Sequence, residues 1–90
     1  MPKKRSRLDI ITDMLASIQE KGGEIKPTHL MYKSNLSHVQ MTSYLEDLLQ
    51  KEAVLRISRN NRDYLIITEK GELLLRKLKE MQEFSRTFGI

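Results

Sequence analysis

The lysine and arginine side chains are the groups in this 90-residue sequence best suited to bind a ligand, and they are unevenly distributed. Four of them lie in the first seven residues, and their charge equals the net +4 of the whole chain. Residues 25–45 contain two lysines and no acid, and residues 56–62 contain three arginines. Ammonium and guanidinium groups attract phosphates, so these stretches predict a surface for a polyanion if the fold brings them together. The cations concerned are Lys3, Lys4, Arg5, Arg7, Lys26, Lys33, Arg56, Arg59 and Arg62.

Other kinds of chemistry find little support in the sequence. The chain has no cysteine, which excludes disulfide scaffolds, thiolate metal sites and thiol nucleophiles. Its two histidines are too few for most all-nitrogen metal sites, and it has neither a glycine-rich phosphate loop nor a nucleophile elbow. No apolar run approaches the ~20 residues of a membrane span, and Asp9 and Asp13 follow the basic start, unlike a signal peptide. We therefore expect an intracellular binding protein with no cofactor, no evident small-molecule ligand, no membrane association and no enzymatic activity.

Three helices are predicted in the first half of the chain. Ser6 and Asp9 have the spacing of a capping box, and apolar residues then recur every three or four positions up to a pair of glycines. A second helix is expected over residues 28–34, after Pro27, which holds the chain extended. Ser37 caps a third, longer helix, and two helices joined by about three residues form a helix-turn-helix arrangement. The apolar positions are Leu8, Ile10, Ile11, Met14, Leu15 and Ile18 in the first helix, and Met41, Tyr44, Leu45, Leu48 and Leu49 in the third, which ends near Glu52.

The hydrophobic period changes after the third helix. Residues 54–58 and 64–67 are short β-branched runs, and the charged, turn-rich segment 59–63 separates them. This pattern predicts a β-hairpin. The residues expected to face the helices are Leu55, Ile57, Leu65 and Ile67, which leaves Arg56 and the hairpin tip in solvent.

A last helix is predicted to begin after Thr68, whose hydroxyl suits an N-cap. Apolar residues at alternating spacings of four and three give it a short heptad seam, which is typical of association between helices. Leu73, Leu75 and Phe84 lie off this seam, where they could pack on the domain itself. The seam residues are Leu74, Leu78, Met81, Ser85 and Phe88.

Three helices, a hairpin and a last helix follow one another as they do in a winged helix-turn-helix domain. Three segments make this likeness specific, namely the run from Thr28 to Ser37, the run from Tyr44 to Leu48 and the run from Ile67 to Gly71. With them the chain resembles, over residues 6–88, the small archaeal winged-helix family of the ten-kilodalton Sulfolobus DNA-binding proteins. The resemblance implies a mainly α fold with a small β-hairpin, and a DNA-binding homodimer held together by an antiparallel coiled coil of C-terminal helices. It divides the chain into a basic arm (1–7), a winged helix-turn-helix domain (8–67) and a dimerisation helix (68–90).

The third helix would then lie in the major groove of DNA, with its first residues near base edges. Glutamine can make a bidentate contact with adenine, and serine or threonine can bond bases or phosphates. Gln40 could instead complete a capping box with Ser37, and His38 could simply be exposed. Val39 could face a thymine methyl group or pack on the domain. The helix has no arginine or lysine, so we expect modest base specificity, and the expected contacts are Ser37, His38, Gln40, Thr42 and Ser43.

The hairpin, the second helix and the arm supply the remaining expected contacts. Arginines at a hairpin tip suit the minor groove or the flanking backbone, although a solvated tip that prevents strand pairing between chains is the alternative. Lysines on the second helix suit phosphates. The arm could bind DNA, serve as a solubilising tail or act as a localisation signal. The residues expected at DNA are Lys3, Lys4, Arg5, Lys33, Arg56, Arg59, Asn60, Asn61 and Arg62.

These patterns together predict a homodimer that binds double-stranded DNA in the cytoplasm, on the nucleoid. It would act as a transcriptional regulator or as a chromosome-compacting protein. The alternative is a winged-helix module that binds another protein through the same faces. The arginines of residues 56–62 and the acid-free stretch favour DNA.

Overall fold

The computed structural model describes residues 5–89 and places them in four helices and three strands. Along the chain these are α1 (Arg7–Glu20), β1 (Glu24–Ile25), α2 (Pro27–Lys33), α3 (His38–Gln50), β2 (Val54–Arg59), β3 (Arg62–Ile67) and α4 (Glu69–Phe88). The predicted architecture, mainly helical with a small hairpin, is confirmed. Lys3 and Lys4 lie outside the described residues.

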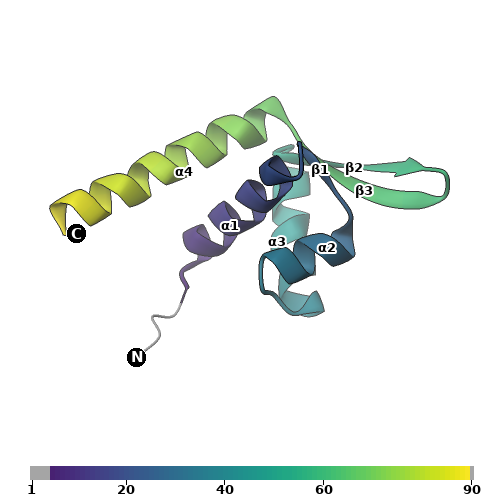
Figure 1. Cartoon of the computed structure of the whole chain (residues 1–90), viewed down its shortest axis with the longest axis horizontal. Helices are drawn as coiled ribbons and strands as arrows, with labels where there is room; N and C mark the ends of the chain where they lie inside the picture. The colour runs from purple at the N-terminus through teal and green to yellow at the C-terminus, as the bar shows by residue number, and fades with distance from the viewer. Residues whose placement is uncertain (1–4, 90) are drawn as a thin grey trace.

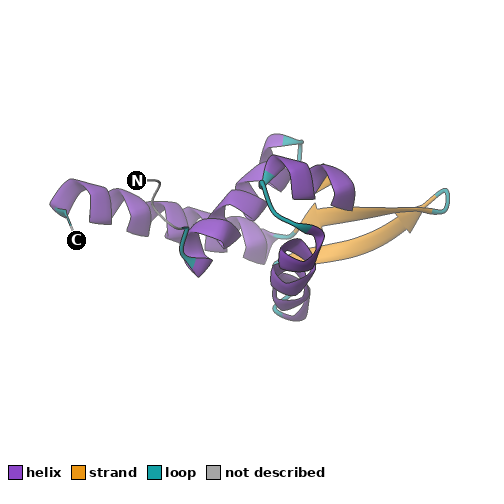
Figure 2. Cartoon of the chain, turned by 90° about the horizontal axis from the view of Figure 1, so that it is seen from below, coloured by secondary structure: helices purple, strands orange, loops and turns teal. Residues whose placement is uncertain are grey.

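The helices α1, α2 and α3 form the centre of the molecule. Figure 1 shows the hairpin of β2 and β3 projecting from one side of this centre and α4 from the other. Figure 2 shows the same two projections from below, pointing in opposite directions. The molecule is therefore elongated, with extents of 48, 29 and 22 Å. The hairpin and the second half of α4 both offer surface beyond the central helices.

The sheet has three antiparallel strands in the order β1, β3, β2. Glu24 and Ile25 of β1 pair with Ile66 and Leu65 of β3. The predicted two-stranded hairpin thus gains an edge strand. Because a strand of two residues shows no alternation of polar and apolar positions, the sequence carries no signal for it.

The hairpin turns through Asn60 and Asn61, both in the left-handed conformation with φ of 53° and 63°. Two left-handed central residues are typical of the type I′ turn, whose twist matches that of the flanking strands. Asparagine tolerates this conformation better than most residues that have a side chain. The strands therefore extend to Arg59 and Arg62, and the connection is two residues long instead of the predicted five.

The strand β2 turns a different face to the helices than predicted. Val54 pairs with Ile67, and cross-strand partners share a face, which here is the buried one together with Leu65. Leu55 therefore points to the opposite face and is 47% exposed, and Ile57 lies on that outer face as well. The prediction is right for Leu65 and Ile67 and wrong for Leu55 and Ile57, because the register sets Val54, and not Leu55, opposite the buried Ile67.

The core lies between α1, the helix-turn-helix, the inner face of the sheet and the first half of α4. Met14, Leu15 and Ile18 of α1 are fully buried, whereas Leu8 in its first turn is 46% exposed and was wrongly placed in the apolar stripe. Pro27 begins α2 instead of preceding it, at a position where its missing N–H leaves no hydrogen bond unmade. The rest of the core consists of Ile10, Ile11, Ile25, Leu30, Leu36, Met41, Leu45, Leu48, Ala53, Val54, Leu65, Ile67, Leu75 and Leu78.

Three helices end in the same way, with a left-handed residue directly after the C-cap. In α1 this residue is Gly22, in α2 it is Asn35 and in α3 it is Glu52, with φ of 83°, 54° and 60°. In each case this residue and the next donate their N–H groups to carbonyls of the last helical turn, which is the Schellman motif. Glutamate is the least suited of the three residues to this position, because its side chain crowds the left-handed backbone.

Replacing Glu52 with glycine is expected to raise the free energy of unfolding by about 0.5–1 kcal/mol, since the relief of left-handed strain exceeds the entropic cost of glycine. The Glu52 side chain contributes little of its own, because its ion pair with Lys70 spans 4.0 Å and both side chains are exposed. Urea unfolding of the two proteins measures the difference. Glu46→Gly, within α3, is the matched control and should lose about 1 kcal/mol. An equal loss in both variants would contradict the strain at Glu52.

Candidate nucleic-acid interface

The start of α3 is held by two reciprocal hydrogen bonds. The Ser37 hydroxyl accepts from the Gln40 backbone N–H at 3.1 Å, and Gln40 Oε1 accepts from the Ser37 backbone N–H at 3.0 Å. The capping box that was the alternative interpretation of Gln40 is therefore confirmed. Contact of either residue with DNA stays a prediction, in which Gln40 would use its amide nitrogen as donor.

The outward face of α3 presents small and uncharged groups at its start and a carboxylate further along. Val39 is 77% exposed, so it does not pack on the domain. His38 and Ser43 are also exposed, and Thr42 is half-buried. Glu46 lies about one turn beyond Ser43 and is exposed, and the sequence analysis missed it. The signal for Glu46 was its position seven residues after Val39, which places both on one side of the helix.

Two cations predicted to contact DNA already have partners within the chain. Lys33 of α2 forms an ion pair with Glu20 at the end of α1. The hydrogen bond from Lys33 lowers the pKa of Glu20 below its ordinary value. Arg5 donates to the Asp13 carboxylate at 3.0 Å and reaches the turn between α2 and α3. The structure therefore gives Lys33 and Arg5 internal roles, and their contact with DNA stays a prediction.

A third cation ties α1 to α3. Arg7 forms an ion pair with Asp47 and lies over the ring of Tyr44, with its guanidinium carbon 5.7 Å from the ring centre. Lys51 also donates to Asp47 at 3.0 Å. This hydrogen bond from Lys51, together with the charges of Lys51 and Arg7, lowers the pKa of Asp47. The exposed face of α3 is thus held relative to α1 by charged contacts as well as by the core.

The three arginines of the hairpin differ in what they contact. Arg59 donates two hydrogen bonds to the Glu24 carboxylate, at 3.0 and 2.9 Å, and lies 5.2 Å over the ring of Tyr64. The bond to Glu24 raises the pKa of Arg59 above its ordinary value. Arg56 and Arg62 are exposed, and neither has an ion pair within residues 5–89. Arg56 shares the face of its partner Leu65, and Arg62 shares the opposite face with its partner Arg59, so each face of the hairpin has one arginine available to bind an anion.

The beginning of α2 adjoins the hairpin. A cleft of about 320 Å³ lies between the start of α2 and the hairpin, and it is lined by Lys21, Glu24, Ile25, Lys26, His29 and Tyr64. The sequence analysis did not place Lys21 or His29 near the hairpin. Two lysines, Lys21 and Lys26, thus lie near the base of the hairpin, beside the Glu24 carboxylate that Arg59 already bonds.

The apolar residues of α4 are divided between the core and the surface. Leu78 is 4% exposed and Leu74 is half-buried against the core, so the placement of Leu78 in an exposed seam is wrong. Phe84, expected to pack on the domain, is instead 55% exposed. Met81 and Phe88 are 57% and 65% exposed, and the rings of Phe84 and Phe88 lie 4.7 Å apart. We call Met81, Phe84 and Phe88 the terminal stripe.

The other predicted residues of α4 complete this division. Leu75 is buried in the core as expected, while Leu73 is 50% exposed and does not pack on the domain as predicted. Ser85 is half-buried and lines a cleft of about 470 Å³ with Met81, Phe84 and two charged residues. The same helix thus serves the core with its first half and leaves its second half uncovered.

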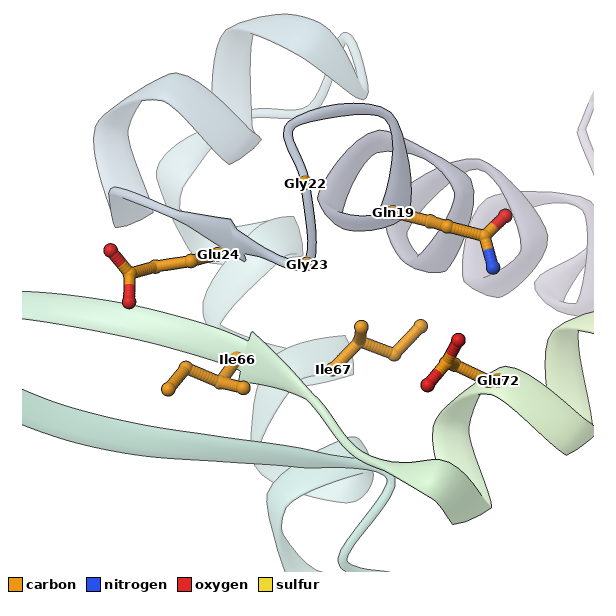
Figure 3. Close-up of a pocket in the computed structure, with 7 residues that line it drawn as sticks. All are labelled: Gln19, Gly22, Gly23, Glu24, Ile66, Ile67 and Glu72. Atoms are coloured by element: carbon orange, nitrogen blue, oxygen red, sulfur yellow. The ribbon is translucent and has the colours of Figure 1, made fainter.

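A third cleft, of about 500 Å³, lies where the end of α1 and the sheet meet the start of α4 (Figure 3). Ile66 and Ile67 of β3 line it, and Gln19, Glu24 and Glu72 supply its polar side chains. Two carboxylates and no cation disfavour a phosphate there. This cleft is not part of the basic surface.

Within the described residues, no cluster of three or more histidine, cysteine, aspartate or glutamate side chains could hold a metal ion. None of the helices described is both long and apolar enough to cross a membrane.

Comparison with known proteins places this geometry in a family. Residues 4–86 match the family model described as winged helix-turn-helix. The uncharacterized protein MJ0290 of Methanocaldococcus jannaschii is 35% identical over 78 residues. That match spans 87% of this chain and 34% of MJ0290, so the chain corresponds to about a third of its relative.

Two solved structures are similar to the whole arrangement of helices and sheet. Sso10a-2, described as a DNA-binding protein from Sulfolobus solfataricus, has a TM-score of 0.85 at 25% identity, over 93% of this chain and 85% of its own. The transcriptional regulator BldR from Sulfolobus solfataricus has a TM-score of 0.73 at 18% identity, over 89% of this chain and 60% of its own, which shows the fold alone. The chain belongs to the winged helix-turn-helix family.

Proposed function

We propose that this protein binds double-stranded DNA, with α3 in the major groove and the hairpin against the neighbouring backbone or minor groove. The observation that carries the proposal is the pair of exposed arginines, Arg56 and Arg62, on a hairpin that projects from the central helices (Figure 1), together with an exposed and uncharged start of α3. Small polar groups at the start of such a helix suit base edges, and exposed arginines suit phosphates and narrow minor grooves. The likeness to Sso10a-2, a DNA-binding protein, supports the proposal.

The binding mechanism divides into positioning and reading. Arg56, Arg62 and Lys26 would contact phosphates and fix the register of the domain on the duplex. His38, Val39 and the other exposed groups of α3 would then reach base edges. Because α3 has no arginine or lysine, the phosphate contacts dominate affinity, and we expect modest discrimination between sequences.

Modest discrimination suits two roles, a transcriptional regulator with a loosely defined operator or a protein that compacts the nucleoid. Selection of bound duplexes from a random pool separates them, because a regulator enriches a defined site whereas an architectural protein retains the pool without enrichment. Failure to retain any duplex at low salt would contradict DNA binding. It would favour the alternative in which the same surface binds an acidic protein.

We also propose that two copies associate through the terminal stripe. Exposed aromatic and methionine side chains at helical spacing form a surface that a second copy of the same helix can cover. A twofold arrangement would place the two α3 helices on successive turns of one duplex, which is how paired recognition helices usually bind. Association would also add buried apolar surface to a chain too small to bury much by itself.

The double variant Met81→Glu/Phe84→Glu is expected to sediment as a single chain, while the unaltered protein sediments as two. Two carboxylates on the terminal stripe would face their counterparts across the interface, where burial of unpaired charge is strongly unfavourable. Lys79→Gln/Arg86→Gln is the matched control, since it lowers the net charge by the same two units on the other side of α4 and should leave the pair intact. Equal sedimentation of both variants would show that the stripe does not hold the copies together.

A further inference from the structure

Arg5 joins three segments of the chain through one guanidinium group. Nη1 donates to Asp13 Oδ2 of α1 at 3.0 Å and to the carbonyl of Ser34 at 2.7 Å. Nη2 donates to the carbonyl of Asn35 at 2.8 Å. Ser34 and Asn35 form the turn between α2 and α3, and they lie 29 and 30 residues away from Arg5 in sequence. We call Arg5 and Asp13 the turn clamp.

The turn that Arg5 contacts sets the direction of α3. Only residues 34–37 separate α2 from α3. The orientation of the two peptide groups that contain the Ser34 and Asn35 carbonyls therefore largely sets the direction of the α3 axis. Carbonyls at a helix C-terminus lack partners within the helix and carry partial negative charge. A planar guanidinium that bonds two successive carbonyls satisfies both and fixes their relative orientation.

The backbone N–H groups of Asn35 and Leu36 fix the end of α2, but the carbonyls of Ser34 and Asn35 point to Arg5. Asn35 is left-handed, with φ of 54°. Ser34 is 2% exposed, and its hydroxyl oxygen is the single buried polar side-chain atom without a hydrogen-bond partner in residues 5–89. The Ser34 hydroxyl therefore does not replace the bonds from Arg5.

The turn clamp is too exposed to act mainly as a stabiliser of the whole fold. The side chains of Arg5 and Asp13 are 33% and 48% exposed, and ion pairs at such positions contribute little to global stability. The turn clamp instead fixes the local geometry of the turn. Asp13 anchors the Arg5 guanidinium to α1, and the guanidinium in turn orients the Ser34 and Asn35 carbonyls.

We propose that Arg5 and Asp13 are positioning residues, which orient α3 for the duplex, and that Arg5 does not itself contact a phosphate. This inference rests on the proposed DNA-binding function. It revises the role expected for Arg5 from sequence, where Arg5 belonged to a basic arm on DNA.

Binding of a labelled duplex of mixed sequence, titrated at several salt concentrations, tests this role with the full-length variants Arg5→Gln and Asp13→Asn. Each variant should bind roughly tenfold more weakly, as expected for losing hydrogen bonds to a charged group, with an unchanged slope of log affinity against log salt. Arg76→Gln, which removes one exposed charge from α4, is the matched control and should bind as the unaltered protein does. The double variant should bind no more weakly than either single variant, because both remove the same clamp.

A direct phosphate contact by Arg5 makes the opposite prediction. Arg5→Gln would then flatten the salt slope by about 0.9 for each bound copy. Asp13→Asn, which removes a negative charge, would bind as tightly as the unaltered protein or more tightly. That pair of results would overturn the proposal.

Amide hydrogen exchange in the absence of DNA separates failure of the turn clamp from failure of the proposed function. The amides of Asn35 and Leu36 donate to Tyr32 and Met31 carbonyls and should exchange faster in Arg5→Gln. Amides in the middle of α1 should be unaffected, which excludes a general loss of stability. Unchanged exchange at Asn35 and Leu36 would overturn the clamp even if the protein binds DNA, and faster exchange would support it even if the protein binds none.

Discussion

Replacing Arg56 and Arg62 with glutamate is expected to lower the affinity for duplex DNA by a factor of about 100 or more at moderate salt. Both guanidinium groups are exposed on the projecting hairpin and have no ion pair in the described part of the chain. The substitution removes two phosphate contacts and puts two carboxylates in their place, so attraction becomes repulsion. Because each lost contact contributes about 0.9 to the slope of log affinity against log salt, the slope should flatten by about 1.8 for each copy.

Fluorescence anisotropy with a labelled duplex measures this loss. Arg76→Glu/Lys79→Glu is the matched control, because it changes the net charge equally at exposed positions of α4. The control should retain most of the affinity. If the control loses as much as the hairpin variant, the effect comes from overall charge, and the hairpin has no special role.

Arg59 is expected to matter less for DNA binding than its neighbours. Its guanidinium is already bonded twice to Glu24 and lies over Tyr64, so contact with DNA would first require breaking an internal pair. The sequence shows three equivalent arginines near the tip, and the structure separates them into one paired and two available groups.

Replacing Gly71 with alanine is expected to lower the free energy of unfolding by about 3 kcal/mol, through overpacking. Alanine is a better helix former than glycine, which alone would predict a gain of about 1 kcal/mol. A β-carbon at Gly71 would, however, lie 2.1 Å from the Ala53 carbonyl oxygen and 2.8 Å from Cγ1 of Ile67. The steric clash with backbone therefore outweighs the gain in helix propensity.

The clash at Gly71 cannot be relieved locally. Ala53 O accepts a hydrogen bond from the Thr68 N–H at 3.1 Å, and the Thr68 hydroxyl accepts from the Gly71 N–H at 3.0 Å. Moving either segment breaks the contact between the start of α4 and the start of β2. Urea unfolding tests the prediction, with exposed Glu72→Ala as control, for which we expect a change within about 0.5 kcal/mol. Equal stability of Gly71→Ala and the unaltered protein would contradict the close approach.

The helices could be predicted from sequence because their signals are local. Ser6 with Asp9, and Ser37 with Gln40, are three residues apart, and both pairs form the capping boxes that this spacing predicts. The hairpin was predicted for the same reason, from two β-branched runs and the polar segment between them. The faces of β2 were not, since they depend on the register with β3.

The candidate site was less predictable, because charged partners are distant in sequence. Lys33 pairs with a residue 13 positions away, and Arg59 with one 35 positions away. Nothing in the local pattern distinguishes a cation that serves the fold from one that faces solvent. The environments of Leu78 and Phe84 could not be predicted either. Apolar residues recur at the same helical spacing whether they pack in the core or at an interface between chains.

The measurement that tests the central claim most directly is a salt titration of duplex binding by the unaltered protein, read by fluorescence anisotropy. We expect binding at low salt that weakens linearly on a log–log plot, with a slope of about −2.7 for each bound copy, because Arg56, Arg62 and Lys26 would each meet a phosphate. No binding at low salt, or a slope near zero, would contradict the proposal that this surface holds double-stranded DNA.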